Sequence, residues 1–459
     1  MSTYLRRTFS GASTSRTTFT LSFWVKRSTF GSMKAIISAE TNNTNNYDQI
    51  IFTSGDQFEI NNVASGSDVI QYKTSAVFRD PSAWYHVVAA IDTTQASASN
   101  GIKIYINGVL QTSLASTTYA QNATFNIGKD GEKTSIGRRE RDGDGYGVGY
   151  LSEFYYIDGQ QKAATDFGQT DSTTGIWKTK TYSGTYGNNG FRLEFKNSGA
   201  LGTDTSGNSE TFTVNNAGTG AQVVDTPSNN FAILNPVAVT NADSVLSKGN
   251  TVHTVKNGNA WIGAYTTLGA TNGKWYSEVK VIDVENTSFG VIQSGGDTAA
   301  NINNDNSGYI GKYADGWGWW GNGSSAQTVN NNNNVNYGTA VSVNDIYMIA
   351  VDITGGKIWM GKNGTWFNGP GTSYAGNPAN GNYPGFTGIT FTDFVHFASG
   401  NEAASGDNAA VSWNFGNASF SISSNSGNGY TDANNFGKFQ YAVPSGYYAL
   451  CTNNINTYG

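Results

Sequence analysis

Residues 347–367 constrain the fold most strongly, because two tight turns there separate three short stretches of strand-like sequence. The stretch YMIAVDITGGKIWMGKNGTWF turns first at Gly355-Gly356 and again at Asn363-Gly364. An Asn-Gly pair between strands favours a type I′ hairpin, because both turn residues then need positive φ. Apolar residues occupy both faces of the middle stretch, so we expect this hairpin to be covered on both sides.

A second hairpin has the same outline. Residues 84–110, WYHVVAAIDTTQASASNGIKIYINGVL, run from strand through loop to strand and then turn at Asn107-Gly108. Upstream, the alternation in residues 19–26, FTLSFWVK, predicts a half-buried antiparallel strand. Short strands separated by turns are typical of all-β sandwiches or barrels rather than parallel α/β sheets. The two hairpins therefore predict two β-domains.

The composition excludes several classes of protein. Of 459 residues, 13% are charged, against roughly 25% in typical domains, so Ser, Thr, Asn and Gly must cover much of the surface. A net charge of -6 argues against a nucleic-acid partner. The one basic cluster, at 133–141, favours a solvated loop over a polyanion site. No apolar run approaches the ~20 residues of a membrane helix, and the N-terminus lacks a signal-peptide core. We expect folding in a cytosol and no membrane insertion.

Three regions follow from the distribution of strands and turns. Residues 1–196 form the first expected β-sandwich. Residues 197–232 are rich in Gly, Asn, Ser and Thr, which predicts a linker with one short strand near 211–214. Residues 233–459 form the second expected sandwich. Cys451 is the sole cysteine, which excludes an intrachain disulfide, and its apolar neighbours predict that it is buried.

Several motifs resemble known families. FTLSFWVK, WYHVVAAID, GIKIYINGVLQ and GYLSEFYYIDG resemble the strands of a laminin-G-like, concanavalin A-type jelly roll over residues 1–165. GKWYSEVKV and VNDIYMIAVDITGGKIWMGKNGTWF resemble a SPRY domain over residues 245–417. The resemblance implies two concanavalin A-like antiparallel β-sandwiches in tandem, a jelly roll followed by a SPRY fold.

This pair of domains, joined by DTPSNNFAILNP, is similar to virion structural proteins of tailed bacteriophages, particularly marine ones. The opening YLRRTFSGASTSRTTFTLSFWVKRS resembles the same group. The resemblance implies a head or tail appendage, such as a tail fibre or capsid appendage. It would be assembled in the host cytoplasm, carried in the virion and used in host recognition. Expected partners are other virion proteins, further copies of this chain as a homo-oligomer, and host cell-surface glycans. The alternatives are a decoration or adaptor protein without glycan binding, and a glycan-degrading enzyme.

No catalytic residue is expected. A glycoside hydrolase needs two carboxylates about 5–9.5 Å apart across the scissile bond. The positions of Glu278 and Asp283, like those of Glu153 and Asp158, differ by an odd number, so the two side chains of each pair point to opposite faces of a strand. The three histidines lack metal-ligand spacing, and each is expected to be a strand residue with hydrogen-bonded ring nitrogens. We predict that the chain is not an enzyme.

One candidate metal site is present. Asp142 and Asp144 lie two residues apart, which is how loop-type calcium sites begin. The glutamate that would complete an EF-hand is missing, so a plain acidic turn is the alternative. No other cofactor is expected.

The best candidate binding surface is aromatic. Sugars stack their C–H faces on aromatic rings and take hydrogen bonds from amides and carboxylates. One short stretch offers both types of group: Tyr313, Asp315, Trp317, Trp319, Trp320 and Asn322. Alternatively, these rings fill the core. If the stretch is a strand, Trp317 and Trp319 share the inner face and Trp320 points outward.

Overall fold

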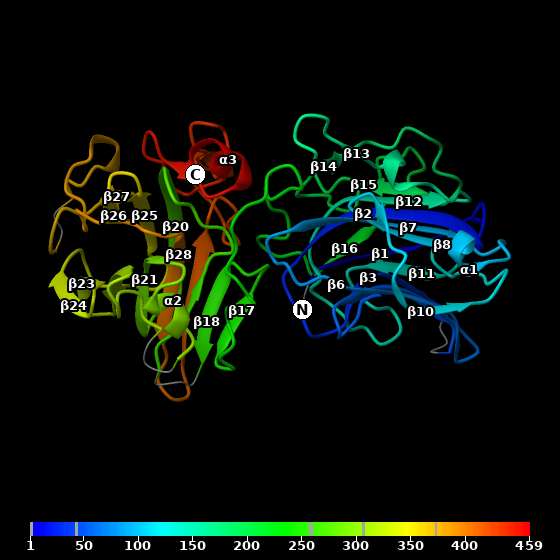
Figure 1. Cartoon of the computed structure of the whole chain (residues 1–459), viewed down its shortest axis with the longest axis horizontal. Helices are drawn as coiled ribbons and strands as arrows, with labels where there is room; N and C mark the ends of the chain where they lie inside the picture. Colours follow the sequence, from blue (N-terminus) through cyan, green and yellow to red (C-terminus); the bar gives the residue numbers. More distant parts are fainter. Residues whose placement is uncertain (1–2, 42–44, 257–259, 305–307, 372–373) are drawn as a thin grey trace. The chain divides into compact units, whose positions relative to one another are not determined.

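The computed structural model describes residues 3–41, 45–256, 260–304, 308–371 and 374–459. The chain is all-β and divides into two compact units. The first unit comprises Met1–Gln222 and Thr226–Ser228, and the second comprises Val223–Asp225 and Asn229–Gly459. Each unit is a sandwich of two mainly antiparallel sheets, as predicted (Figure 1). No helix in the described part of the chain has the length and apolar character needed to cross a lipid bilayer.

The first unit has an eight-stranded and a six-stranded sheet. In order across the larger sheet, the strands are β10 (Leu114–Tyr119), β6 (Ser67–Val77), β5 (Gln57–Ala64), β4 (Tyr47–Phe52), β3 (Lys34–Glu40), β11 (Lys133–Ile136), β1 (Tyr4–Thr8) and β16 (Thr213–Asn215). Those of the smaller sheet are β15 (Phe191–Leu193), β12 (Gly149–Asp158), β2 (Thr18–Arg27), β7 (Trp84–Asp92), β8 (Ile102–Ile106) and β9 (Val109–Leu110). A hairpin of β13 (Gly168–Thr170) and β14 (Trp177–Thr179), the short helix α1 (Ala98–Gly101) and the 3-10 turn η1 (Ala164–Asp166) complete the unit.

The strand β2 shows how this unit is packed. Phe19, Leu21, Phe23 and Val25 alternate into the core between the sheets, as the sequence pattern predicts. The prediction that β2 is only half-buried is wrong, because its other face is buried as well. Residues 160–187 cover that face and form a second apolar layer with β7 and β12.

The first sandwich extends beyond residue 196. Strand β16 pairs with β1, with Val214 opposite Leu5, and Phe212 is packed in the core with only 2% of its surface exposed. The structure therefore differs from the expected linker at 197–232, since residues 197–222 belong to the first unit. A sequence rich in Gly and Asn still adds a strand, because each short segment needs only one or two buried apolar side chains as anchors.

The second unit also has two sheets. Across the first, the strands are β17 (Ser244–Ser247), β18 (Val252–Lys256), β29 (Asn408–Asn414), β20 (Lys274–Asp283), β25 (Ile346–Asp352), β26 (Lys357–Lys362) and β27 (Thr365–Trp366), with β30 (Tyr448–Ala449) parallel to β20. Across the second, they are β19 (Ile262–Tyr265), β28 (Val395–Glu402), β21 (Asn286–Gln293), β22 (Gly316–Gly321), β23 (Ala326–Asn330) and β24 (Asn333–Asn336). The helices are α2 (Asp297–Asn301) and α3 (Thr452–Tyr458), and the 3-10 turns are η2 (Pro378–Asn380) and η3 (Asn425–Gly427).

The predicted hairpin at 347–367 is strands β25, β26 and β27. Asn363 and Gly364 have φ of 49° and 89°, the positive values of a type I′ turn. Both faces of β26 are buried, as expected. Ile358 and Met360 face the core between the sheets, whereas Trp359 packs beneath a layer formed by the C-terminal residues.

That C-terminal layer is held to the first sheet by Glu278. Its carboxylate accepts hydrogen bonds from the backbone N–H groups of Gln440 (2.8 Å) and Tyr441 (2.7 Å), and from the side chains of Tyr276 and Asn414. Burial raises the pKa of Glu278 to about 7, even though these donors favour the charged form. Glu278 is therefore a structural anchor. Cys451 lies in the same layer, fully buried, where desolvation raises its thiol pKa to about 11.

Candidate functional site

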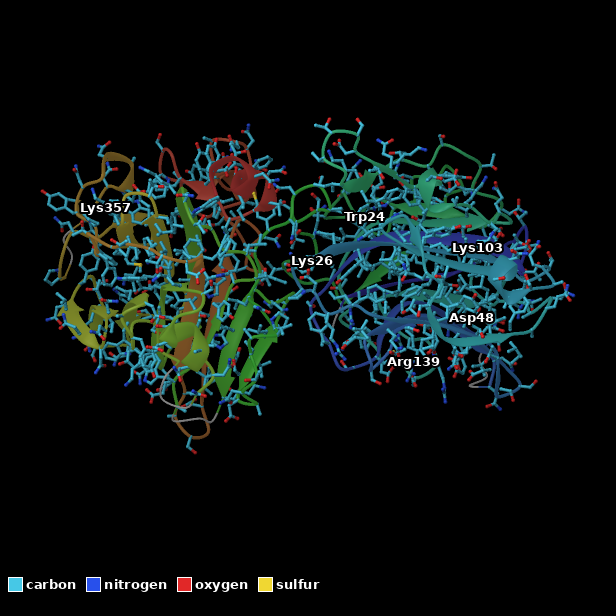
Figure 2. The ribbon with its side chains drawn as sticks, in the orientation of Figure 1. Trp24, Lys26, Asp48, Lys103, Arg139 and Lys357 are labelled. Atoms are coloured by element: carbon cyan, nitrogen blue, oxygen red, sulfur yellow. The ribbon has the colours of Figure 1, made fainter. Side chains whose placement is uncertain are left out.

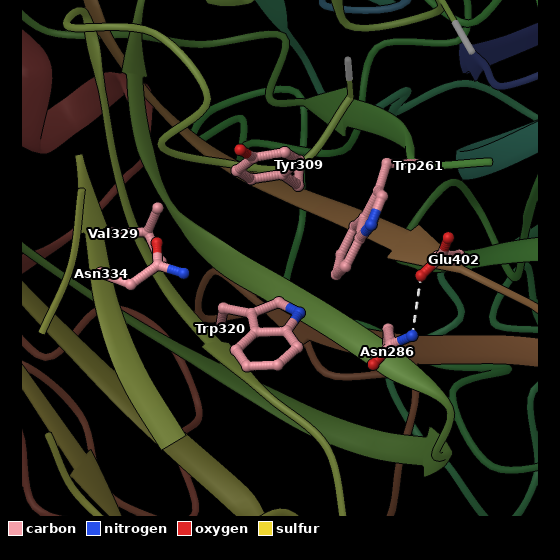
Figure 3. Close-up of a pocket in the computed structure, with 7 residues that line it drawn as sticks. All are labelled: Trp261, Asn286, Tyr309, Trp320, Val329, Asn334 and Glu402. Carbon is pink, nitrogen blue, oxygen red and sulfur yellow. Dashed lines mark hydrogen bonds between the residues drawn. The ribbon is translucent and has the colours of Figure 1, made fainter. Parts of the chain in front are cut away.

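A pocket of about 180 Å³ lies on the second sheet of the second unit, on the face that points away from the core. Figure 3 shows three aromatic rings around it, with amide and carboxyl groups between them. We call it the aromatic pocket. It is lined by Trp261, Asn286, Tyr309, Trp320, Val329, Asn334 and Glu402.

The strand register brings most of these residues to one face. Asn286 at the start of β21 is paired with Glu402 at the end of β28. On the other side of the pocket, Val329 on β23 is paired with Asn334 on β24. Directly paired residues of antiparallel strands project to the same face, with Cβ atoms about 5 Å apart. The sheet therefore presents polar and apolar side chains together around the rings.

Strand β22 supplies the central ring. Trp319 is fully buried and Trp317 is 8% exposed, and both pack in the core of the sandwich. Trp320 points to the opposite face and lines the aromatic pocket. This is the alternation that the sequence predicts for a strand.

A second wall comes from residues 308–313, which lie flat on the outer face of the sheet. The backbone N–H of Ile310 donates to Ser288 Oγ at 2.9 Å. A Cβ atom at Gly318 would lie 2.0 Å from the carbonyl oxygen of Ile310, and one at Gly400 would lie 2.0 Å from that of Gly308. Glycine at these two positions thus permits the close approach that brings Tyr309 to the pocket.

The rings and polar groups of the aromatic pocket are held in place by their neighbours. Trp261 and Tyr309 meet edge to face, with ring centroids 5.4 Å apart, and the Tyr309 hydroxyl is hydrogen-bonded to Asn332. Asn286 Nδ2 donates to Glu402 Oε2 at 2.7 Å, the dashed line in Figure 3. The side chains are therefore positioned before any ligand arrives.

The two indole N–H groups of the pocket have no acceptor among the described residues. Within the part of the chain that the structure describes, neither Trp261 nor Trp320 donates a hydrogen bond from its indole nitrogen. Buried tryptophans of the same unit do: Trp319 Nε1 donates to the Tyr337 carbonyl at 3.0 Å, and Trp413 Nε1 donates to Ser399 Oγ at 3.1 Å. The pocket thus offers two free donors beside its apolar ring faces.

Of the six predicted ligand-binding residues, Trp320 lines the pocket. Asp315 instead holds helix α2, because its carboxylate accepts hydrogen bonds from the backbone N–H (3.1 Å) and hydroxyl (2.5 Å) of Thr298. Tyr313 is not among the residues that line the pocket; its carbonyl oxygen accepts a hydrogen bond from Asn331 N at 3.2 Å. Asp315 and Tyr313 therefore have structural contacts within the loop that precedes β22.

Asn322 does not line the pocket but contacts a residue that does. Its Oδ1 closes a tight turn by accepting from the backbone N–H groups of Ser324 and Ser325, each at 2.9 Å. Its Nδ2 lies 3.4 Å from Asn286 Oδ1 and so helps to orient that amide. Asn322 therefore positions a lining residue.

Sequence reasoning missed the other six lining residues: Trp261, Asn286, Tyr309, Val329, Asn334 and Glu402. Tyr309 belongs to the same aromatic-rich run as Trp320, so that run carried a signal for it. Asn286, Glu402, Val329 and Asn334 come together through strand pairing, and Trp261 directly precedes β19. Asn286 and Glu402 are 116 positions apart in the sequence, and no local pattern indicates that their strands are neighbours.

The predicted calcium site is occupied by an arginine. The guanidinium of Arg139, labelled in Figure 2, is hydrogen-bonded to both Asp142 and Asp144. A cation bound there would have to displace that charge. Over the described residues, no group of three or more His, Cys, Asp or Glu side chains is arranged to hold a metal ion.

Two buried polar groups of the first unit have structural roles. Asp48 (Figure 2) accepts hydrogen bonds from Asn62 and from the backbone of residues 126–127, and burial raises its pKa to about 6. His86 is hydrogen-bonded to Ser22 Oγ at 2.9 Å, and Trp177 Nε1 donates to its Nδ1 at 2.9 Å. Desolvation lowers the His86 pKa to about 3, so the imidazole is neutral with both nitrogens used. His86 is thus the hydrogen-bonded strand residue that was predicted.

Three solved structures are similar to part of this chain. Solved structures similar to this chain include the SPRY domain of human HERC1 (14% identity, TM-score 0.29, 39% of this chain and 96% of that one) and the TRIM65 PSpry domain (14%, 0.28, 40% and 92%). The stonustoxin structure is also similar (14%, 0.29, 40% of this chain and 28% of that one). At these TM-scores the likeness carries no argument about function. No curated protein matches the sequence.

One family model matches part of the first unit. Residues 3–158 match a laminin G model described as "Concanavalin A-like lectin/glucanases superfamily". The match covers the strands whose sequences resemble a laminin-G-like jelly roll, and it supports a carbohydrate- or protein-binding role. Over those residues, the chain is similar to concanavalin A-like lectins and glucanases.

Proposed function

We propose that this chain is a non-enzymatic glycan-binding protein whose aromatic pocket receives one sugar ring. The observation that carries the proposal is the composition of the pocket wall. Three rings, two amides and one carboxylate surround a cavity of about 180 Å³. A sugar has both an apolar C–H face and many hydroxyl groups, and this wall offers a partner to each.

The size of the cavity favours a single ring. Pockets that enclose drug-sized ligands measure roughly 300–1,000 Å³, so a longer glycan would leave most of its length outside. Because the contacts of Trp261, Tyr309 and Asn286 already fix their orientations, little side-chain entropy is lost on binding. The unused indole N–H groups can donate to sugar hydroxyls.

Binding without hydrolysis fits the carboxyl content of the site. Glu402 is the one carboxylate among the described residues that line the aromatic pocket. Glycoside hydrolysis ordinarily needs a second carboxylate on the other side of the bond. Glu278 is taken up by its four hydrogen bonds, and Glu153 is paired with Arg192 at 2.8 Å. We expect no release of reducing sugar from glycans incubated with the protein.

We further propose that the protein is carried in the virion of a tailed phage as a head or tail appendage. The support is the resemblance of its two domains and their junction to virion structural proteins. In that setting, the pocket would contact glycans on the host cell surface, and further copies of the chain and other virion proteins would be its assembly partners. Labelling of purified virions with an antibody against the chain tests this placement.

A glycan array tests the binding function. The full chain should bind a defined set of glycans, and Trp320→Ala should reduce that binding at least about tenfold. Tyr383→Ala is the matched control, because Tyr383 is 57% exposed in the same unit but does not line the pocket. Binding that survives Trp320→Ala would place the glycan site elsewhere. A full chain that binds no glycan would instead favour a decoration or adaptor protein.

A further inference from the structure

We propose that the sugar bound in the aromatic pocket carries a protonated amino group, and that Glu402 together with the aromatic rings selects for this charge. The inference rests on the proposed glycan-binding function and names the class of sugar. It comes from how the charged groups around the pocket are arranged.

Glu402 is held at the edge of the cavity with one oxygen available. Its Oε2 accepts a hydrogen bond from Asn286 Nδ2 at 2.7 Å. In the described chain, no residue donates to Oε1. Figure 3 shows the carboxyl group beside Trp261. An ammonium group entering the pocket could therefore donate a charge-assisted hydrogen bond to Glu402, which is stronger than a bond from a neutral hydroxyl.

The rings favour the same charge. A cation within about 6 Å of an aromatic ring centroid is attracted by the π-electron face, most strongly by tryptophan. This protein already uses one of the three rings in this way, since Lys312 Nζ lies 5.4 Å from the centroid of Tyr309. Trp261 and Trp320 have no such cation among the described residues.

A neutral sugar would use the site less well. It could stack on the rings, but it would partly dehydrate Glu402 without bringing a compensating charge, which is unfavourable. An anionic sugar would be repelled by the Glu402 carboxylate. Lys312 does not line the pocket but lies over the Tyr309 ring, and its ammonium would oppose a cationic ligand. Removing the Lys312 charge should therefore strengthen the binding of an amino sugar.

The test compares three methyl glycosides on the full chain: glucosamine, N-acetylglucosamine and glucose. Binding is followed by titration calorimetry. We expect glucosamine to bind about tenfold more tightly than either neutral sugar. Glu402→Gln should remove most of that preference and leave the part that the rings supply, Glu402→Asp should keep more of it, and Lys312→Met should strengthen glucosamine binding alone. The matched control is Asp407→Asn, which alters an exposed carboxylate that does not line the pocket.

The outcomes separate this inference from the function on which it rests. If all three sugars bind equally in a Trp320-dependent manner, the preference for charge is overturned while the glycan-binding function stands. An unchanged preference in Glu402→Gln, with the fold intact by circular dichroism, also overturns the role of Glu402. If no sugar binds but a wider glycan array is positive, the amino-sugar class is wrong. If neither gives binding, the function itself fails.

Discussion

Each unit places aromatic side chains on the outer face of a sheet, in a buried layer around Trp24 in the first unit and around a pocket in the second. In the first unit, Trp24 stacks on His86 with centroids 4.8 Å apart, and Trp177 from β14 closes over them and donates to His86. In the second unit, Trp261 and Trp320 face a cavity, and residues 308–313 form only one wall of it. The same kinds of side chain build a buried layer in one sandwich and a pocket in the other.

The difference lies in what the chain places over each face. In the first unit, residues 160–187 cover the outer face of the sheet, and Trp177 from this segment donates a hydrogen bond to His86. In the second unit, the glycines at 318 and 400 let residues 308–310 lie tightly on the sheet, and Trp320 still lines the pocket beside them. Binding capacity therefore depends on where the covering segment ends, as well as on which residues are aromatic.

The largest expected effect is a difference in stability between variants of the two tryptophans, Trp24 in the buried layer and Trp320 in the pocket. Trp24→Ala should lower the free energy of unfolding of the first unit by about 3–5 kcal/mol, because Trp24 is 4% exposed and its loss leaves a cavity. Trp320→Ala should cost the second unit about 1 kcal/mol or less. Hydrogen exchange resolved by unit measures both. Equal losses would mean that the pocket tryptophan is also a packing residue.

The stability of the first unit should depend on pH because of His86. Its pKa is about 3 in the fold and about 6.5 when unfolded, so the unfolded state binds a proton first as the pH falls. Stability from neutral His86 is therefore present above about pH 6.5 and is lost toward pH 3. The slope is about 1.4 kcal/mol for each pH unit.

This pH effect is measured as the difference between the parent and His86→Gln in denaturant unfolding across pH 4–7. Subtracting the variant removes the opposing contribution of Asp48, whose raised pKa stabilises the fold as the pH falls through about 6. A difference that stays constant with pH would contradict a neutral, fully hydrogen-bonded His86.

A smaller effect is expected from moving the covering loop. In Gly318→Ala, the new methyl group would lie 2.0 Å from the Ile310 carbonyl oxygen, so the segment that carries Tyr309 must shift. We expect a loss of about 1–3 kcal/mol in stability and weaker glycan binding. Gly323→Ala is the matched control, since no atom lies within 4 Å of its added methyl group. Unaltered binding in Gly318→Ala would show that Tyr309 contributes little.

The smallest effect is expected from Tyr309→Phe. The variant keeps the ring and loses only the hydroxyl that is hydrogen-bonded to Asn332. Affinity for the glycan should fall by no more than about threefold, the equivalent of one exposed hydrogen bond. Tyr309→Ala should instead resemble Trp320→Ala. If Phe and Ala variants lose affinity equally, the hydroxyl rather than the ring contacts the ligand.

Local sequence patterns predicted the elements whose geometry is set locally. The Asn-Gly pairs at 107–108 and 363–364 adopt positive φ, because few other residues tolerate that conformation at both turn positions. Trp317, Trp319 and Trp320 divide between core and surface as the two-residue period of a strand requires. In each case, the deciding contacts lie within a few residues.

Features that depend on distant segments were not predictable in this way. The burial of both faces of β2 depends on residues 160–187, and the pairing of Asn286 with Glu402 depends on the order of strands in the sheet. The region 197–222 is strand-poor by composition, yet Phe212 fixes it to the core. Asp142 and Asp144 are a different case, because the residue that binds both carboxylates, Arg139, is a close neighbour in the sequence.

The buried Cys451 makes the C-terminal layer open to kinetic measurement. Its thiol is the only one in the chain, is fully covered and has a pKa near 11, so thiol reagents at neutral pH should reach it only when the layer detaches. The labelling rate of the unmodified protein would then report the detachment frequency. A reporter cysteine placed at Asn334 would react first, giving a fluorescent probe of the pocket with no other cysteine to remove.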